Sequence, residues 1–265
     1  MVLERALAKA FKGFHNLYGK SLKSVLYNLT GAPTISYSVI NIPSSQVVTP
    51  NEQQHIDEFW AKLAKNLSKG FIAYLVPREP TEEEIENNQE SDRYMKQYHL
   101  NNGIYFHHSY PVLALKELRY QGKSIRLVKL RNAWINEIWG GDWSNSSELW
   151  NDDLRAAVGY EEGKIEHGCF WMSVRDTMAY FEEFNVNKVM PRYFYSNLKV
   201  VPDERRFGRA VILAKVVKKG KYTFTVNQQD TCFFPSSQFV HSPIKLTLGM
   251  FGKDSKPKIL AHTST

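Results

Sequence analysis

Three short stretches decide the fold: HHSYPV at 107–112, LVKLRNAWINEIWGGDWSNSSELW at 127–150, and GCFWMSVRD at 168–176. Their apolar and β-branched residues, separated by turn residues, predict strands near 104–120, 124–131 and 168–173. His108 stands at the head of the first strand and Asn132 at the end of the second. The intervening residues are enough for a hairpin that brings the two side chains together. Taken alone, a His and an Asn at such positions are ordinary structural residues.

The remaining pattern up to residue 190 mixes helices with strands. Apolar residues recur at helical spacing over 1–18 and 52–69, and a third helix is predicted near 174–184. FIAYLV at 71–76 indicates a buried strand. Residues 79–92 hold seven acidic groups and almost nothing apolar, so we expect a solvated loop there, although its carboxylates could also offer oxygen ligands to Ca²⁺. These elements predict an α+β fold with an antiparallel sheet and flanking helices.

From about residue 190 the pattern changes to strands alone, at 209–217, 221–228 and 244–251. This predicts the start of an antiparallel β-sandwich with too few strands for two closed sheets. The charge changes at the same place: residues 1–190 carry a net charge of −2 and residues 191–265 a net charge of +9. We therefore expect two domains, 1–190 and 191–265.

Composition excludes several classes of protein. No apolar run reaches the roughly 18 residues that a membrane-spanning helix needs. The charged residues Glu4, Arg5 and Lys9 argue against a signal peptide. Two cysteines, Cys169 and Cys232, without a CxxC pair argue against a disulfide framework or a zinc site. A reducing, cytoplasmic location fits best, and no nucleic-acid recognition motif accompanies the positive charge.

The three stretches resemble the second half of the calpain cysteine-protease core, a papain-like fold. HHSYPV is similar to the family's G-H-A-Y-S-V, and HGCFWMS is similar to D-G-x-F-W-M-S. RNAWINEIWGGDWSN is similar to R-N-P-W-G-x-x-E-W-x-G-x-W-S-D. The helix VLERALAKAFKGFHNLYG and the LTGAP segment at 29–33 extend the resemblance over residues 2–190, and the basic tail is similar to the start of the calpain β-sandwich.

The resemblance implies a role for each matching residue. His108 matches the catalytic base, Asn132 the residue that orients its ring, and Trp134 the indole that covers the pair. The family's nucleophilic Cys lies far upstream of the His, in a separate subdomain, yet no Cys precedes His108 in these 265 residues. The first helix already matches the start of the second subdomain. We therefore expect the half with the nucleophile to be missing or separately encoded.

Two further departures concern calcium and the Asn. The resemblance places the calcium ligands of the family at Ile138, Asn145, His167 and Cys169, which include one amide and no carboxylate. Since Ca²⁺ takes six to eight hard oxygen ligands, we expect no calcium site and no cofactor here. Ala133, Ile135 and Pro111 also replace the family's Pro, Gly and Ser, which puts the His–Asn geometry in question.

Two functions remain open from the sequence. The first is a calpain-like cysteine endopeptidase family member that is inactive as this isolated chain, either a non-catalytic homologue or a fragment whose first half is encoded elsewhere. The second is a binding or scaffold module for protein or anionic lipid, in which the lysines and arginines of the tail meet a negative surface. Those basic side chains could equally be solvated strand faces and turns.

Overall fold

The computed structural model describes residues 2–17, 21–44, 47–86, 103–120, 122–134, 139–159, 167–190, 194, 196, 198–199, 211–220, 222–226, 246–251 and 257–262. The chain divides into two compact units, one of residues 25–193 and one of residues 1–24 with 194–265. The predicted domain boundary near residue 190 stays a prediction. Among the described residues, no helix is long and apolar enough to cross a membrane.

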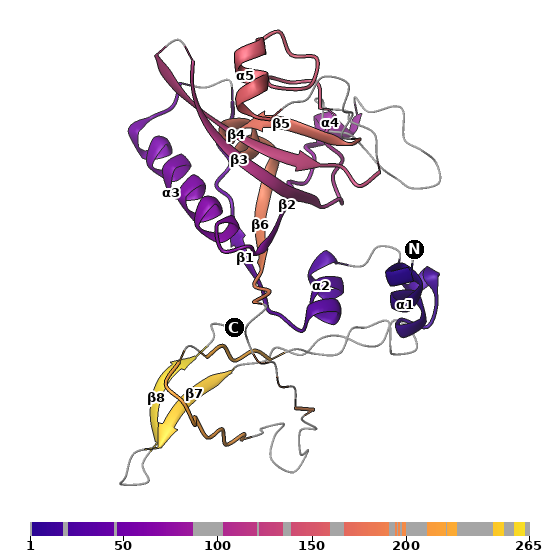
Figure 1. Ribbon diagram of the computed structural model, residues 1–265, viewed down its shortest axis with the longest axis vertical. Coiled ribbons are helices and arrows are strands. Elements are labelled where there is room, and N and C mark those ends of the chain that lie inside the picture. Colours follow the sequence, from indigo (N-terminus) through magenta and orange to yellow (C-terminus); the bar gives the residue numbers. More distant parts are fainter. Residues whose placement is uncertain are drawn as a thin grey trace. The chain divides into compact units, whose positions relative to one another are not determined.

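The larger unit is built on a six-stranded sheet in the order β1-β6-β2-β3-β4-β5 (Figure 1). Every neighbouring pair in this sheet is antiparallel. With the helices beside it, the sheet confirms the predicted α+β class. The strands are β1 (Thr34–Ser38), β2 (Ile72–Pro77), β3 (Tyr110–Tyr120), β4 (Lys123–Arg131), β5 (Cys169–Ser173) and β6 (Phe181–Asn187).

The hairpin of β3 and β4 forms in the predicted region, although β3 begins at Tyr110 and not near residue 104. The two strands pair from Val112 with Leu130 to Tyr120 with Lys123. Gly122 takes a φ of 75° in the connecting turn, a conformation that suits glycine. β5 pairs along the other edge of β4, from Leu127 with Ser173 to Arg131 with Cys169. The three predicted strands therefore lie side by side.

Several helices begin with capping residues that fit them. The longest, α3, starts with a capping box in which Thr49 and Glu52 satisfy each other's backbone N–H groups, and Pro50 occupies its first turn. Its buried side chains are Ile56, Phe59, Leu63 and Asn66. The helices are α1 (Val2–Ala10), α2 (Leu22–Thr30), α3 (Pro50–Leu67), α4 (Glu82–Glu86), α5 (Asp152–Ala157) and α6 (Val174–Tyr180), with a 3₁₀ turn at Phe14–Asn16.

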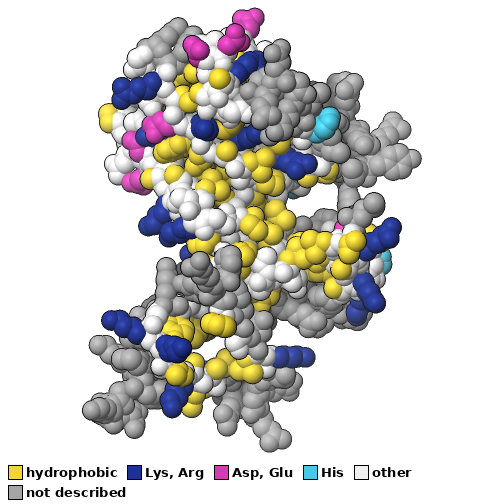
Figure 2. All heavy atoms as spheres, viewed as in Figure 1, with side chains coloured by type: hydrophobic (Ala, Val, Ile, Leu, Met, Phe, Trp, Pro, Cys, Tyr) yellow, Lys and Arg dark blue, Asp and Glu magenta, His cyan; other side chains and the backbone are white. Residues whose placement is uncertain are grey.

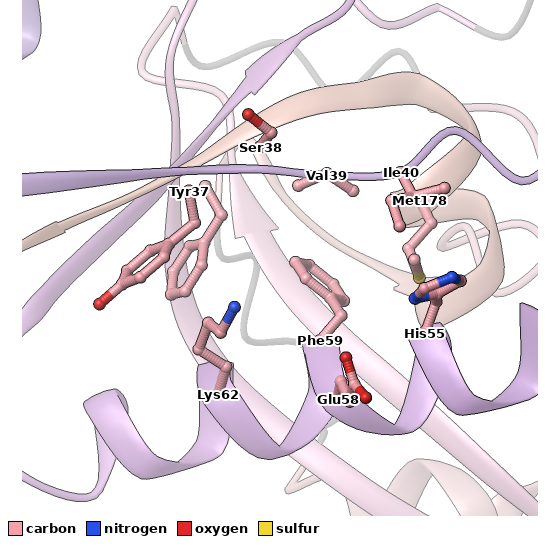
Figure 3. Close-up of a pocket in the computed structure, with 10 residues that line it drawn as sticks. Tyr37, Ser38, Val39, Ile40, His55, Glu58, Phe59, Lys62 and Met178 are labelled. Atoms are coloured by element: carbon pink, nitrogen blue, oxygen red, sulfur yellow. The ribbon is translucent and has the colours of Figure 1, made fainter. Parts of the chain in front are cut away.

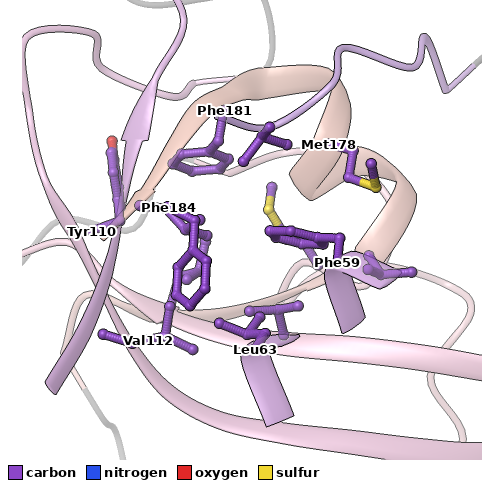
Figure 4. Close-up of a cluster of buried hydrophobic side chains, with 14 of the residues drawn as sticks. Phe59, Leu63, Tyr110, Val112, Met178, Phe181 and Phe184 are labelled. Carbon is purple, nitrogen blue, oxygen red and sulfur yellow. The ribbon is translucent and has the colours of Figure 1, made fainter. Parts of the chain in front are cut away.

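The main core lies between α3, α6 and one face of the sheet (Figure 4). Phe184 of β6 is fully buried, stacks on Tyr37 with ring centroids 5.6 Å apart, and meets the edge of Phe59 at 6.0 Å. Tyr110 is 1% exposed and meets Phe181 edge to face at 5.5 Å. This core anchors the start of β3, directly after His108.

A second, smaller core involves the hairpin, β5, α5 and the 139–151 loop. It consists of Leu127, Trp143, Leu154 and Trp171, with Trp150 packed against it. The rings of Trp143 and Trp150 meet edge to face at 5.0 Å. The aromatic density of the sequence therefore serves largely to hold this loop on the sheet.

Two predicted helices are longer than the observed ones. The helix predicted over 174–184 ends at Tyr180, because residues 181–187 form β6, whose alternating side chains Phe184 and Val186 are fully buried on the sheet. The helix predicted over 1–18 ends at Ala10. Lys12 and Gly13, with φ of 63° and 142°, end the helical path there.

The acidic segment predicted as a solvated loop contains the short helix α4. Thr81 and Glu84 cap it, and both oxygens of Glu84 accept hydrogen bonds at 2.8 Å from Arg78. Three of the seven acidic groups, Glu79, Glu82 and Glu83, are exposed as expected. The rest of the segment, from residue 87 to 92, lies outside the described residues.

The smaller unit contains the antiparallel hairpin of β7 (Thr247–Phe251) and β8 (Pro257–His262). β7 falls within the strand predicted at 244–251. In contrast to the prediction, 211–217 and 222–226 do not form strands. Their apolar side chains are exposed, Val211 at 83% and Leu213 at 77%, so they lack the burial that favours strands. The complete β-sandwich stays a prediction.

Candidate active site

His108 lies in the short connection that leads into β3. The residue before it, His107, has a φ of 54°, in the left-handed region that non-glycine residues seldom adopt. The ring of His107 meets the buried Phe106 ring at 5.2 Å, and its Nε2 lies 3.6 Å from Glu79 Oε2. His108 itself is half-buried. The chain thus turns sharply to present His108 beside the end of the hairpin.

Asn132 directly follows the last residue of β4 and is 1% exposed. Its backbone N–H donates to the carbonyl of Gly168 at 2.8 Å, which continues the ladder between β4 and β5. Its side-chain Oδ1 accepts a hydrogen bond from the backbone N–H of Trp134 at 3.0 Å. Strand pairing on one side and a tight turn on the other therefore hold Asn132 in place.

Trp134 covers the imidazole of His108. The two ring centroids are 4.1 Å apart with the planes tilted by 34°, and the indole is 39% exposed. Tyr105 meets Trp134 edge to face at 5.2 Å, and the Tyr105 N–H donates to the hydroxyl of Tyr110 at 2.9 Å. The structure therefore brings His108, Asn132 and Trp134 together, as the predicted hairpin requires.

The electrostatics of this cluster favour a neutral imidazole. Burial lowers the pKa of His108 below its usual value of 6.5, and the Asn132 side chain, which favours the charged ring, offsets this only in part. Nε2 of His108 is buried and has no hydrogen-bond partner among the described residues. A neutral imidazole beside an amide can accept a proton, which is the task of a general base.

A small cavity lies elsewhere, between α3 and the segment that follows β1 (Figure 3). Its volume is about 70 Å³. Phe59 and Met178 point into it from the apolar side, and His55, Glu58 and Lys62 stand along α3. Its lining includes none of the three candidate site residues, so it does not extend the His108 cluster.

Comparison with known proteins shows the family of the chain. Residues 1–188 match the family described as calpain family cysteine protease. The chain belongs to the calpain family. Its six-stranded antiparallel sheet with helices is compatible with a calpain protease core domain.

Calpain relatives are similar over different portions of the chain. The calpain-type cysteine protease DEK1 of Arabidopsis thaliana is 28% identical over 72% of this chain and 8% of its own length. Calpain clp-4 of Caenorhabditis elegans is 26% identical over 73% of this chain and 24% of its own length. The calpain-1 catalytic subunit of Homo sapiens is 36% identical over 32% of this chain and 12% of its own length. The chain thus spans at most about a quarter of these calpains.

The structure describes three of the four residues that the resemblance placed at the family's calcium ligands, namely Asn145, His167 and Cys169. Asn145 Nδ2 donates to the backbone carbonyl of Cys169 at 3.3 Å, and the backbone carbonyl of Asn145 accepts from Arg155 Nη2 at 3.2 Å. A cationic guanidinium therefore donates to the Asn145 backbone carbonyl, whereas Ca²⁺ sites are rich in carboxylates. The expected absence of a calcium site stays a prediction. His167 is exposed and Cys169 is buried, while Ile138 lies outside the described residues.

The described geometry does not place Cys169 as a nucleophile. Cys169 begins β5 and is 9% exposed between Gly168 and Phe170. Cys232 lies outside the described residues.

Sequence reasoning missed several neighbours of the site. The Gly168 carbonyl holds Asn132, and Tyr105 packs on Trp134. The family motif included Gly168, but nothing in the sequence pattern connected Tyr105 or Arg155 with this region. These contacts depend on how the loops pack against the sheet, and the hydrophobic periodicity of the sequence does not predict that packing.

Proposed function

We propose that this chain supplies the His/Asn half of a calpain-type centre for peptide-bond hydrolysis. His108 acts as the base that draws a proton from a thiol, Asn132 orients its ring, and Trp134 excludes water from the pair. The observation that carries the proposal is the half-buried His108 ring beneath Trp134 and beside Asn132. Burial keeps the imidazole neutral and therefore ready to accept a proton.

These 265 residues do not by themselves supply the nucleophile in this proposal. An apolar, buried setting raises the pKa of a thiol and makes it inert, which argues against Cys169. Losing the nucleophile of a concerted triad costs on the order of 10⁶ in turnover. The chain is then either a non-catalytic homologue or the partner of a Cys-bearing segment that belongs to a longer polypeptide or to a separate one.

Labelling with an epoxide thiol inhibitor, combined with peptide-cleavage assays of the 265-residue chain, tests the missing nucleophile. We expect no cleavage and no active-site labelling, with His108→Ala as the matched control. Covalent labelling of Cys169 or Cys232 coupled to cleavage would refute the proposal. Sequencing the transcript upstream of Met1 then separates the two alternatives, since an in-frame Cys-bearing segment would make the longer product a protease that loses activity with His108→Ala.

A second candidate function is binding to an anionic surface. Residues 211–220 expose Lys215, Lys218 and Lys219 together with the apolar side chains of Val211, Leu213 and Val217. On the face shown in Figure 2, however, the described Lys and Arg side chains are scattered and do not form one patch. Each basic residue near an anionic membrane contributes about 1 kcal/mol.

Vesicle sedimentation distinguishes this second function. Binding to vesicles with anionic lipid that weakens with salt, and that is lost when Lys215, Lys218 and Lys219 are replaced by Gln, supports it. Absence of binding at every salt concentration rules it out. We also propose an acidic protein as an alternative partner of these basic side chains. A cytoplasmic location is part of the proposal, and cell fractionation tests it.

A further inference from the structure

The start of β5 is held from both sides by two different residues. On the inner side, the carbonyl of Gly168 accepts the N–H of Asn132 at 2.8 Å. On the outer side, the next carbonyl, that of Cys169, accepts Nδ2 of Asn145 at 3.3 Å. Consecutive carbonyls of a strand point to opposite edges. The Asn145 side chain therefore takes up one hydrogen-bonding position on the outer edge of β5.

The strand register supports this assignment. Arg131 and Cys169 face each other in the ladder between β4 and β5, one position before the pair of Asn132 and Gly168. In an antiparallel ladder, hydrogen-bonded and non-hydrogen-bonded pairs alternate. Since Asn132 and Gly168 are hydrogen-bonded, the backbone of Cys169 points away from β4, toward Asn145.

Arg155 secures Asn145 from the other side. Its Nη2 donates to the carbonyl of Asn145 at 3.2 Å, and its guanidinium lies 5.7 Å from the ring centre of Trp150. Arg155 is on α5, whose Leu154 is buried in the second core. The contacts thus run from α5 through Asn145 to β5, and from β5 to Asn132.

We propose that Asn145 and Arg155 form a metal-independent brace that positions Asn132, and through it the ring of His108. Asn145 and Arg155 are positioning residues in this arrangement, and the inference rests on the proposed pairing of His108 with Asn132. In place of a cation surrounded by carboxylates, the loop is held by an amide donor and a guanidinium. The geometry of the His108 cluster is therefore independent of calcium.

Nuclear magnetic resonance of the full chain tests the brace without a nucleophile. The measurements are the amide exchange rates of Asn132 and Trp134 and the pH titration of the His108 ring, with calcium and with a chelator. In Asn145→Ala we expect exchange at Asn132 to be roughly two- to tenfold faster, the change that loss of one hydrogen bond produces. We also expect the His108 titration to shift, and calcium to have no effect.

Two further variants keep the test decisive if Asn145→Ala fails to fold. Arg155→Ala should speed exchange at Asn132 in the same way, and Arg155→Lys, which keeps a cationic donor, should restore it in large part. Gln53→Ala is the matched control, because it removes an exposed amide that donates to Asp57 on α3. It should leave both readouts unchanged.

Unchanged exchange at Asn132 in both alanine variants would overturn the brace, as would a slowing of exchange by calcium in the parent chain. Both readouts are independent of peptide cleavage. The brace can therefore fail while His108 and Asn132 still support catalysis with an added nucleophile. Conversely, the exchange and titration results can support the brace even if the cleavage assays refute the proposed function.

Discussion

The ring centroids of Trp134 and His108 are 4.1 Å apart, and the two planes are tilted by 34°. This contact removes one face of the imidazole from water. Burial is the main cause of the lowered pKa of His108. The half-exposed indole of Trp134 therefore helps to set the charge state of the His108 ring.

Replacing Trp134 with Ala should raise the pKa of His108 toward its usual value of 6.5, because the imidazole gains water on the uncovered face. Trp134→Phe should preserve much of the lowered pKa. Titration of the His108 ring signals measures both. An unchanged pKa in Trp134→Ala would mean that other residues desolvate the ring.

Replacing Asn132 with Ala should lower the pKa of His108 further, because the amide favours the charged ring. The same change removes the acceptor of the Trp134 N–H and should cost about 0.5–1.5 kcal/mol of unfolding free energy. Asn132→Asp should instead raise the pKa of His108, since a carboxylate stabilises the charged imidazolium. Chemical denaturation and ring titration provide the two measurements.

The stability of the larger unit should fall as the pH drops below about 6.5. The pKa of His108 is lowered in the folded state, so below the unfolded value the unfolded chain binds a proton that the folded chain does not. The loss of this stability contribution is complete once the pH is below the pKa of His108 in the folded state. His108→Gln should remove this part of the pH dependence, whereas the exposed His15→Gln should retain it.

Replacing Glu84 with Gln should destabilise the connection between β2 and α4 by about 1.5–3 kcal/mol at neutral pH. Hydrogen bonds from Arg78 lower the pKa of Glu84, so this contribution is present above its usual value of 4.5 and is lost as the pH falls through the folded pKa. Glu83→Gln, on the same short helix and exposed, is the matched control. Equal effects of the two substitutions in denaturation experiments would contradict this assignment.

Replacing Phe184 with Ala should destabilise the larger unit by about 3–5 kcal/mol, because the ring is fully buried between Tyr37 and Phe59. Leu113→Ala, at a position 47% exposed on β3, should cost far less. Thermal unfolding followed by circular dichroism compares the two. Similar losses would show that Phe184 does not belong to the cooperative core.

Much of the fold follows from local patterns, and the errors have identifiable causes. The hairpin of β3 and β4 was predictable because its apolar residues alternate and a glycine turn joins the strands. β6 was missed because MAYFEEF also fits a helix, and its pairing with β1 and β2 decides the matter. β1 was missed because Thr34, Ser36 and Ser38 give it a polar pattern.

The site was predictable in part. Motif resemblance marked His108, Asn132 and Trp134, and the hairpin explains why they meet. The contacts of Asn145 with Cys169 and of Arg155 with Asn145 were not predictable, because they join a loop, a strand edge and a helix. Such contacts depend on tertiary packing and leave no periodic signal.

The position of β6 between β1 and β2 has a consequence for how the protein is made. Thr34 of β1 lies beside Asn187 of β6, its partner 153 residues later in the chain. During translation β1 emerges long before β6, and among the described strands it has no other partner. Until β6 arrives, β1 and one edge of β2 are open to pairing with other chains. The nascent chain therefore exposes these strand edges until residues 181–187 have been synthesised and β6 can join β1 to β2.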